Sequence, residues 1–154
     1  MKATKKELLE LNRIFDLLGK FGGQIETEDP ENWATLEVEV NDLQHISIGM
    51  FELVDGDVVL NPSFELKVKR LKGTGAFIED AEITSYEAYE PFGLVTIDEN
   101  GVYNAENSLT GNGEKDEFGL SARFSYFMNQ IVEEGPYLKE PKNVKKYEKM
   151  AAVE

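Results

Sequence analysis

The sequence predicts an α+β fold: a mainly antiparallel sheet of about five strands, with an N-terminal and a C-terminal helix packed on one face. Three observations support this. Apolar residues recur at helical spacing near both ends of the chain, they alternate with polar residues in the middle, and turn-forming pairs divide that middle part. Helices that flank a run of strands in this way are typical of α+β domains.

The first element is an amphipathic helix over about residues 4–20. Thr4 and Glu7 have the spacing of a capping box, which satisfies two backbone N–H groups at a helix start. Apolar residues then recur every three or four positions on one helical face: Leu8, Leu11, Ile14, Phe15 and Leu18. Gly22-Gly23 is expected to end the helix, and an acidic loop with a proline follows.

Strands are predicted next, because apolar and charged residues alternate. Residues 36–40 place Leu36, Val38 and Val40 on one face and Glu37 and Glu39 on the other. The ranges 45–54 and 63–71 show the same alternation and complete an antiparallel meander. Further strands are predicted over 81–90 and 94–98, then a hairpin turn at Asn100-Gly101. The polar residues 104–116 are interpreted as a surface loop.

A second helix is predicted over about residues 117–134. Its apolar residues form one face, namely Leu120, Phe124, Phe127, Met128 and Ile131, and Gly135-Pro136 ends it. We expect residues 1–138 to form a single α+β domain and 139–154 a basic C-terminal tail. Val144, Tyr147 and Met150 are spaced for a short helix docked on the domain, and a frayed terminus is the alternative.

The composition restricts the location and chemistry of the protein. The chain has 154 residues and no cysteine, so disulfides and thiolate chemistry are excluded. Charged residues interrupt the first fifteen positions, and no apolar run approaches the roughly 20 residues that span a bilayer. A cytoplasmic location is therefore expected.

Acidic residues dominate the charge, with a net value of −14. No lysine or arginine occurs between residues 21 and 66 or between 73 and 114. A protein with such a charge is repelled by nucleic acid and by anionic lipid, so we expect a basic protein partner, no direct nucleic-acid binding and no membrane contact. The candidate interaction surface consists of Glu26, Glu28, Asp29, Glu31, Glu37, Glu39, Glu79, Asp80 and Glu82.

Asp55-Gly56-Asp57 raises the question of a metal site. In a calcium loop of the EF-hand type the third ligand would fall on Val59, so the motif fails. Asp-Gly is instead a favoured pair for a two-residue hairpin turn. The nearby Asn61-Pro62 predicts a bulge or a strand break, because proline cannot donate to a sheet ladder.

A second calcium-like spacing occurs at Asn112, Glu114 and Asp116. Glu117 stands where the loop needs glycine, and Arg123 stands where it needs a bidentate glutamate. A solvated loop, with Asp116 capping the following helix, is the simpler interpretation.

His45 is the only histidine of the chain. No cysteine or second histidine can complete a zinc site with it, and no G-x-S-x-G motif supplies a nucleophile for it to activate. Its position near a strand start predicts a structural role. The sequence thus predicts no catalytic residue, no metal ligand and no cofactor, and it leaves open whether the protein is an enzyme.

Seven aromatic residues come from the later strands and the second helix: Tyr86, Tyr89, Phe92, Tyr103, Phe124, Tyr126 and Phe127. Aromatic side chains supply much of the buried area of a small domain, so we expect them in the core and at its rim. The alternative is that they line a pocket.

The segments "DGDVVLNPSFELKV", "AEITSYEAYEPFG" and "ARFSYFMNQIVEEG" resemble, in their order, small uncharacterised domains of bacteria and their mobile genetic elements. In those domains a Gly-Asp and Asn/Asp-Pro strand pair precedes a closing helix with an aromatic face. The resemblance spans residues 53–138. It implies an α+β fold and no particular activity.

Two functional hypotheses follow. The first is a non-enzymatic acidic interaction protein that engages a basic, nucleic-acid-binding partner, with its carboxylates in the place of phosphates. The alternative is a domain that binds a small molecule or a metal, or an enzyme, with a pocket between the sheet and the closing helix. Carboxylates gathered on one convex face favour the first hypothesis, and a lined cavity favours the second.

Overall fold

The computed structural model of the chain describes residues 2–54, 57–71, 77–90, 93–105, 114–115 and 119–151. The helical elements are α1 (Lys5–Leu18), α2 (Gly119–Asn129) and the π-helix η1 (Gln130–Glu134). The strands are β1 (Gly22–Thr27), β2 (Leu36–Asp42), β3 (His45–Val54), β4 (Asp57–Arg70), β5 (Ile78–Glu90), β6 (Gly93–Ile97), β7 (Val102–Ala105), β8 (Glu114–Lys115) and β9 (Pro141–Lys146).

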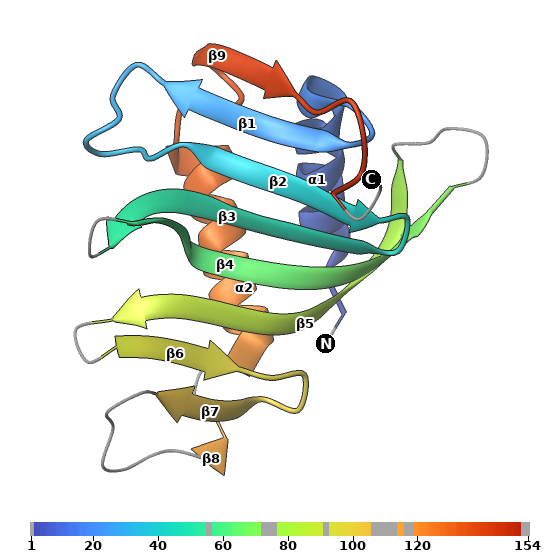
Figure 1. The fold of residues 1–154 in the computed structure, drawn as a ribbon. Helices are drawn as coiled ribbons and strands as arrows, with labels where there is room; N and C mark the ends of the chain where they lie inside the picture. Colours follow the sequence, from blue (N-terminus) through green and yellow to red (C-terminus); the bar gives the residue numbers. More distant parts are fainter. Residues whose placement is uncertain are drawn as a thin grey trace.

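The described strands form one antiparallel sheet in the order β8-β7-β6-β5-β4-β3-β2-β1-β9. Strands β1 to β8 each lie beside their neighbours in sequence, whereas β9 joins the far edge beside β1. Both helices run across the same face of the sheet (Figure 1). The predicted α+β class is therefore confirmed. Among the described residues, neither helix is both long and apolar enough to cross a membrane.

The predicted number of about five strands was wrong, because the described residues form nine. Strand β1 begins at the glycines that were interpreted as a helix stop. Strand β8 and the second half of β7 fall within the predicted loop 104–116, and β9 falls within the tail. These four strands are short or glycine- and lysine-rich, so their alternation is too weak to predict a strand without knowledge of the pairing.

The two positions at the start of β1 require glycine, because the backbones of β2 and β9 lie too close for a side chain. A Cβ atom on Gly22 would lie 2.2 Å from the carbonyl oxygen of Val38, and one on Gly23 would lie 1.9 Å from that of Lys145. Both residues also have positive φ angles, 77° and 156°. Glycine thus lets β2 and β9 approach β1 from its two sides.

Helix α1 starts as the sequence predicts. The Thr4 hydroxyl accepts a hydrogen bond from the Glu7 backbone N–H at 3.1 Å, and the Glu7 carboxylate accepts one from the Thr4 N–H at 2.9 Å. Asn12 then ties the helix to β5, because its amide donates to the Ile78 carbonyl at 2.9 Å and accepts from the Ile78 N–H at 2.7 Å. These bonds fix α1 on the sheet.

One predicted turn and one predicted bulge are confirmed. Strands β3 and β4 pair antiparallel, with Val54 opposite Asp57, and the predicted turn at Asp55-Gly56 lies outside the described residues. The Asp98 carboxylate accepts hydrogen bonds from the N–H groups of Asn100 and Val102 in the turn between β6 and β7. The register of β3 and β4 shifts at Asn61-Pro62, which is a cis peptide.

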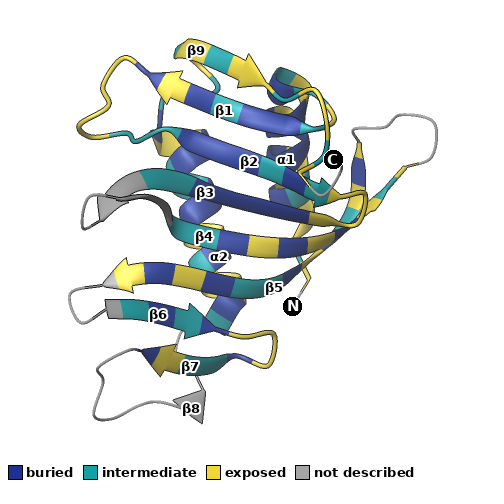
Figure 2. Cartoon of the chain, in the orientation of Figure 1, coloured by how far each residue is buried: buried dark blue, intermediate teal, exposed yellow. Residues whose placement is uncertain are grey.

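The core lies between the two helices and the sheet. The largest fully buried side chains are Tyr137, Phe15, Phe64, Phe124, Leu11, Ile14, Leu18, Ile25, Leu36, Ile46, Ile48 and Leu66. Figure 2 shows that β2 and the adjoining part of β3 are buried along most of their length. Burial of each such aliphatic or aromatic side chain contributes roughly 1.5–3 kcal/mol relative to its exposure, so this layer provides most of the driving force for folding.

Candidate functional site

A groove of about 460 Å³ lies between α2 and the helix-covered face of the sheet. Its described lining residues come from five elements: Met50 on β3, Pro62 and Phe64 on β4, Tyr86 on β5, Ala122, Arg123, Tyr126 and Phe127 on α2, and Gln130 on η1. The groove thus lies between the sheet and the closing helix, where the second hypothesis placed a pocket.

Aromatic rings form the floor of the groove. Phe64 lies at the centre, with its ring centroid 5.1 Å from that of Tyr86, 5.3 Å from that of Phe124 and 5.2 Å from that of Phe127. All four side chains are buried. Rings packed at such distances form a rigid apolar surface, so the floor is preformed.

Polar side chains of α2 and η1 form the rim. The guanidinium of Arg123 lies over the ring of Tyr86, 5.1 Å from its centroid. Tyr126 is 67 % exposed, and its hydroxyl accepts a hydrogen bond from the Gln130 side chain at 3.0 Å. Positions 123, 126 and 130 are three and four residues apart, so one helical face carries all three groups.

The bulge at Asn61-Pro62 shapes the sheet side of the groove. The Asn61 amide donates to the Tyr89 carbonyl at 3.2 Å and its carbonyl oxygen accepts from the Tyr89 N–H at 2.8 Å, so the side chain links β4 to β5. This link leaves Pro62 beside Phe64 in the groove lining. Sequence analysis predicted the bulge and did not connect it with a site.

The structure brings part of the predicted aromatic set together. Tyr86, Tyr126 and Phe127 line the groove and Phe124 lies under it, whereas Tyr89 is 38 % exposed and Tyr103 packs on the core elsewhere. Phe92 lies outside the described residues. Sequence reasoning missed Met50, Pro62, Phe64, Ala122, Arg123 and Gln130 as groove residues. The inward position of Phe64 in an alternating strand was the one usable signal.

The nine predicted carboxylates lie in two separate groups. Glu26, Glu28, Asp29, Glu31, Glu37 and Glu39 belong to β1, β2 and their connection, whereas Glu79, Asp80 and Glu82 belong to β5. Strands β3 and β4 lie between the groups. The structure therefore does not bring them together on one continuous face.

Lysine side chains lie next to the carboxylates of the β5 group. Lys2 Nζ lies 3.2 Å from Asp80 Oδ2, and Lys69 Nζ lies 3.8 Å from Glu79 Oε2. Glu82 is opposite Lys67 on β4. In the other group, Glu26, Glu28, Asp29 and Glu31 are exposed. This exposed set at the end of β1 is the part of the predicted acidic surface whose carboxylates are open to solvent.

The C-terminal segment covers the rest of the first group. Glu37 is only 8 % exposed, because the Tyr147 hydroxyl donates to its carboxylate and the Gln24 amide donates to it at 3.1 Å. Burial and the neighbouring Glu37 raise the pKa of Tyr147 to about 12. Burial, and then Glu37, raise the pKa of Glu39.

The predictions of a short helix or a frayed end for the tail were wrong. Residues 141–146 form β9 and pair antiparallel with β1, with Val144 opposite Ile25. Beyond the strand, the Tyr147 N–H donates to the Gly22 carbonyl at 3.0 Å and the Ala151 N–H donates to the Val40 carbonyl at 2.8 Å. Apolar residues three positions apart are compatible with one edge of a helix and also with the observed strand and the segment after it. The unpaired edge of β1 favours the strand, because it offers backbone hydrogen-bonding groups to β9.

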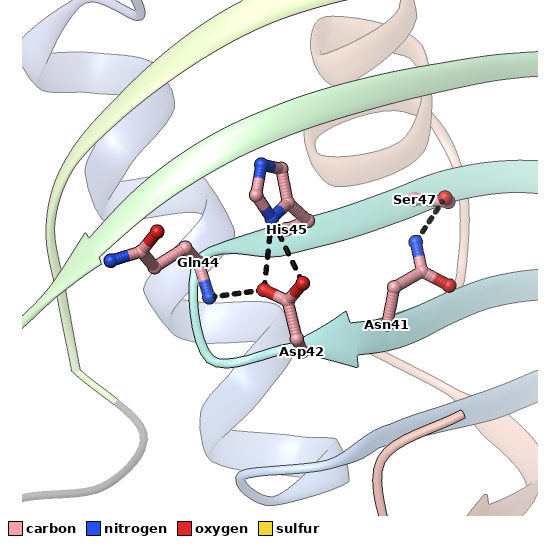
Figure 3. Close-up of polar contacts among 5 residues, drawn as sticks. All are labelled: Asn41, Asp42, Gln44, His45 and Ser47. Atoms are coloured by element: carbon pink, nitrogen blue, oxygen red, sulfur yellow. Dashed lines mark hydrogen bonds and ion pairs between the residues drawn. The ribbon is translucent and has the colours of Figure 1, made fainter. Parts of the chain in front are cut away.

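His45 is the first residue of β3, directly after the turn that joins β2 and β3. Its Nδ1 lies 2.9 and 3.0 Å from the two carboxylate oxygens of Asp42, which also accepts a hydrogen bond from the Gln44 N–H at 2.8 Å (Figure 3). The Gln44 N–H, and then His45, lower the pKa of Asp42. Nearby, the Asn41 amide donates to the Ser47 hydroxyl at 3.1 Å. This arrangement closes the β2–β3 hairpin, which is the structural role that the sequence predicted.

The two calcium-like spacings, neither of which was predicted to bind a metal, lie mostly outside the described residues. Asp55, Asn112 and Asp116 are in this group, while Asp57 and Glu114 are described only as residues of β4 and β8. Within the described ranges, no three His, Cys, Asp or Glu residues gather in a way that could hold a metal ion.

Comparison with known proteins adds no relative: no protein-family model, curated protein or solved structure matches the chain. The resemblance to small domains of bacteria and mobile genetic elements therefore stays a prediction. What the protein does must be argued from its groove and its surface.

Proposed function

We propose that this α+β domain binds a small, largely apolar molecule in the groove between α2 and the sheet. The observation that carries the proposal is a cavity with a buried aromatic floor and a polar rim. Small-molecule sites have volumes of about 300–1,000 Å³ and combine apolar walls with a few polar groups that orient the ligand. The groove has this size and this composition.

The lining favours binding over catalysis. Its described residues comprise apolar and aromatic side chains with one arginine and one glutamine, and they include no carboxylate, histidine, serine or cysteine. General acid–base and nucleophilic catalysis rely mainly on those absent side chains. The π-helical turn at Gln130 adds a further feature, because such turns are frequent at functional sites.

Blocking the groove tests the proposal. Ala122 is an exposed rim residue on α2, so Ala122→Trp adds a large ring at the mouth without disturbing the core. A set of small aromatic and aliphatic compounds is screened by ligand-observed NMR. Compounds that bind the unmodified chain are expected to lose at least about tenfold in affinity for the variant, because the indole fills the volume of the ligand.

Leu9→Trp is the matched control, because Leu9 is 66 % exposed on α1. It adds a similar ring away from the groove and is expected to leave affinity unchanged. Circular dichroism confirms that both variants fold. A screen that yields no binder, or binders that Ala122→Trp does not affect, contradicts the proposal.

The exposed carboxylates support a second candidate function, the engagement of a basic protein partner. Glu26, Glu28, Asp29 and Glu31 are exposed and belong to β1 and the connection that follows it. A concentrated set of like charges raises the association rate with an oppositely charged partner. Such binding weakens as salt rises, because the Debye length falls from about 10 Å at 0.1 M to about 3 Å at 1 M.

A further inference from the structure

The charge of the groove indicates which ligands it can select. Arg123 is the one charged side chain among the described residues that line it. A guanidinium carries five N–H donors in a planar fork, so it can keep a partner within the chain and still present a pair of donors to a ligand. The contact with the Tyr86 ring holds this cation at the edge of the groove floor.

Tyr126 adds a second donor on the same helical face. Its hydroxyl oxygen accepts the hydrogen bond from Gln130, and in the described part of the chain no acceptor takes the hydroxyl hydrogen. That hydrogen is therefore available to a ligand at the exposed rim. Donors from Arg123 and Tyr126, separated by one helical turn, suit an acceptor with two oxygen atoms.

We propose that the groove selects a hydrophobic carboxylic acid, bound as the carboxylate; this inference rests on the proposed function. The carboxylate lies at the rim against Arg123 and Tyr126. The apolar body lies on the floor formed by Phe64, Tyr86 and Phe127. One cation at the rim matches a single negative charge, and phosphate groups, which carry more charge, are matched less well.

The overall charge of the protein does not oppose this selection at short range. The net charge of −14 repels an anion from a distance, but exposed charges beyond a Debye length of about 10 Å at 0.1 M salt are largely screened. Inside the groove the Arg123 guanidinium is the nearest charged group among the described lining residues. The long-range repulsion should slow association rather than remove the preference.

Matched pairs of ligands test the inference. Calorimetry at pH 7 compares 2-naphthoate with 2-naphthamide and octanoate with octanamide, so that each pair shares one apolar body and differs in the charged acceptor group. The unmodified chain is expected to bind each carboxylate about tenfold or more tightly than its amide, because hydrogen bonds to a charged group are stronger than those to a neutral one. Arg123→Gln should abolish that difference and leave amide binding unchanged.

The controls separate selection from folding. Arg13→Gln removes the same charge from an exposed position on α1 and is expected to keep the carboxylate preference. Arg123→Lys keeps the positive charge without the planar fork, so it should retain part of the carboxylate preference. Tyr126→Phe should lower carboxylate affinity several-fold without changing amide affinity. Circular dichroism checks that every variant is folded.

Each result has a distinct meaning. If carboxylate and amide bind the unmodified chain equally, or if the preference survives Arg123→Gln, the selection of carboxylates is overturned while the proposed ligand groove stands. If no member of either pair binds, or if Ala122→Trp does not weaken the binding, both the selection and the proposed function are overturned.

Discussion

Glu10 shows how a single residue can reduce the stability of this fold. It is 4 % exposed on α1, and its Oε2 atom has no hydrogen-bond partner in the described part of the chain. Burial raises its pKa most; Lys6 and Arg13 oppose that shift, while Glu133 and Glu7 add to it. An ionised carboxylate in this position costs free energy, because burial removes water that no partner fully replaces.

The first residue-scale prediction is that Glu10→Gln stabilises the protein at pH 7. With a raised pKa the folded state binds a proton more tightly than the unfolded state, so stability falls as pH rises from the ordinary value through the raised one. The variant should unfold at a higher temperature at pH 7, by about 2–4 °C for a gain of about 1 kcal/mol. The gain should shrink as pH is lowered through that window.

Asp16→Asn is the control for charge, because Asp16 is an exposed acid on the same helix. Thermal unfolding followed by circular dichroism at several pH values measures both variants. If Glu10→Gln unfolds earlier at pH 7 while Asp16→Asn is unchanged, the ionised carboxylate has a favourable partner and the explanation fails.

At the scale of elements, the last part of the chain is bound to β1 and β2 through β9 and the segment that follows it. The strand extends the sheet, and Tyr147 then connects to both neighbours: its hydroxyl donates to Glu37 on β2 and accepts from the Gln24 amide on β1 at 2.7 Å. A hydrogen bond from a hydroxyl to a carboxylate is worth about 1.5–3 kcal/mol. The contact therefore fixes the position of the tail.

We predict that Tyr147→Phe lowers the melting temperature by several degrees, because the variant leaves the buried Glu37 carboxylate with one donor fewer. Tyr126→Phe is a matched control, since it removes a hydroxyl from a tyrosine that is 67 % exposed. It should leave the melting temperature unchanged. Equal melting temperatures for all three proteins would show that the tail contributes no stability through Tyr147.

On the scale of the whole molecule, the apolar groove and the exposed carboxylates lie in different parts of the structure. The groove lies on the helix-covered face of the sheet, whereas the exposed carboxylates lie at the end of β1. The proposed ligand binding and the proposed partner binding are therefore expected to depend on different residues. Variants that change one of these properties are expected to leave the other intact.

We expect a basic partner captured from a cell lysate at low salt to be released at high salt. Replacing Glu28, Asp29 and Glu31 by their amides should reduce capture. The same change at Glu79, Asp80 and Glu82 should matter less, because Lys2, Lys69 and Lys67 accompany those residues. Pull-down followed by mass spectrometry measures this, and a partner retained equally at both salt concentrations argues against an electrostatic interface.

Local signals in the sequence were sufficient for much of the fold. The capping box and helical spacing predicted α1, and the apolar face predicted α2. Alternation predicted β2, β3 and much of β4, and strands were also predicted over most of β5 and β6. Asp-Gly and Asn-Gly marked two of the hairpins. Each of these signals depends on residues within a few positions of one another, so no knowledge of the tertiary arrangement was needed.

The sequence by itself thus determined the α+β class, the helix faces and the chain of hairpins. Only the tertiary structure decided that β9 completes the sheet beside β1, that Tyr147 covers Glu37, and that α2 forms a groove over Phe64. These features join residues that lie more than 60 positions apart along the chain. Such contacts depend on how whole elements pack, because each requires a partner surface that local periodicity does not identify.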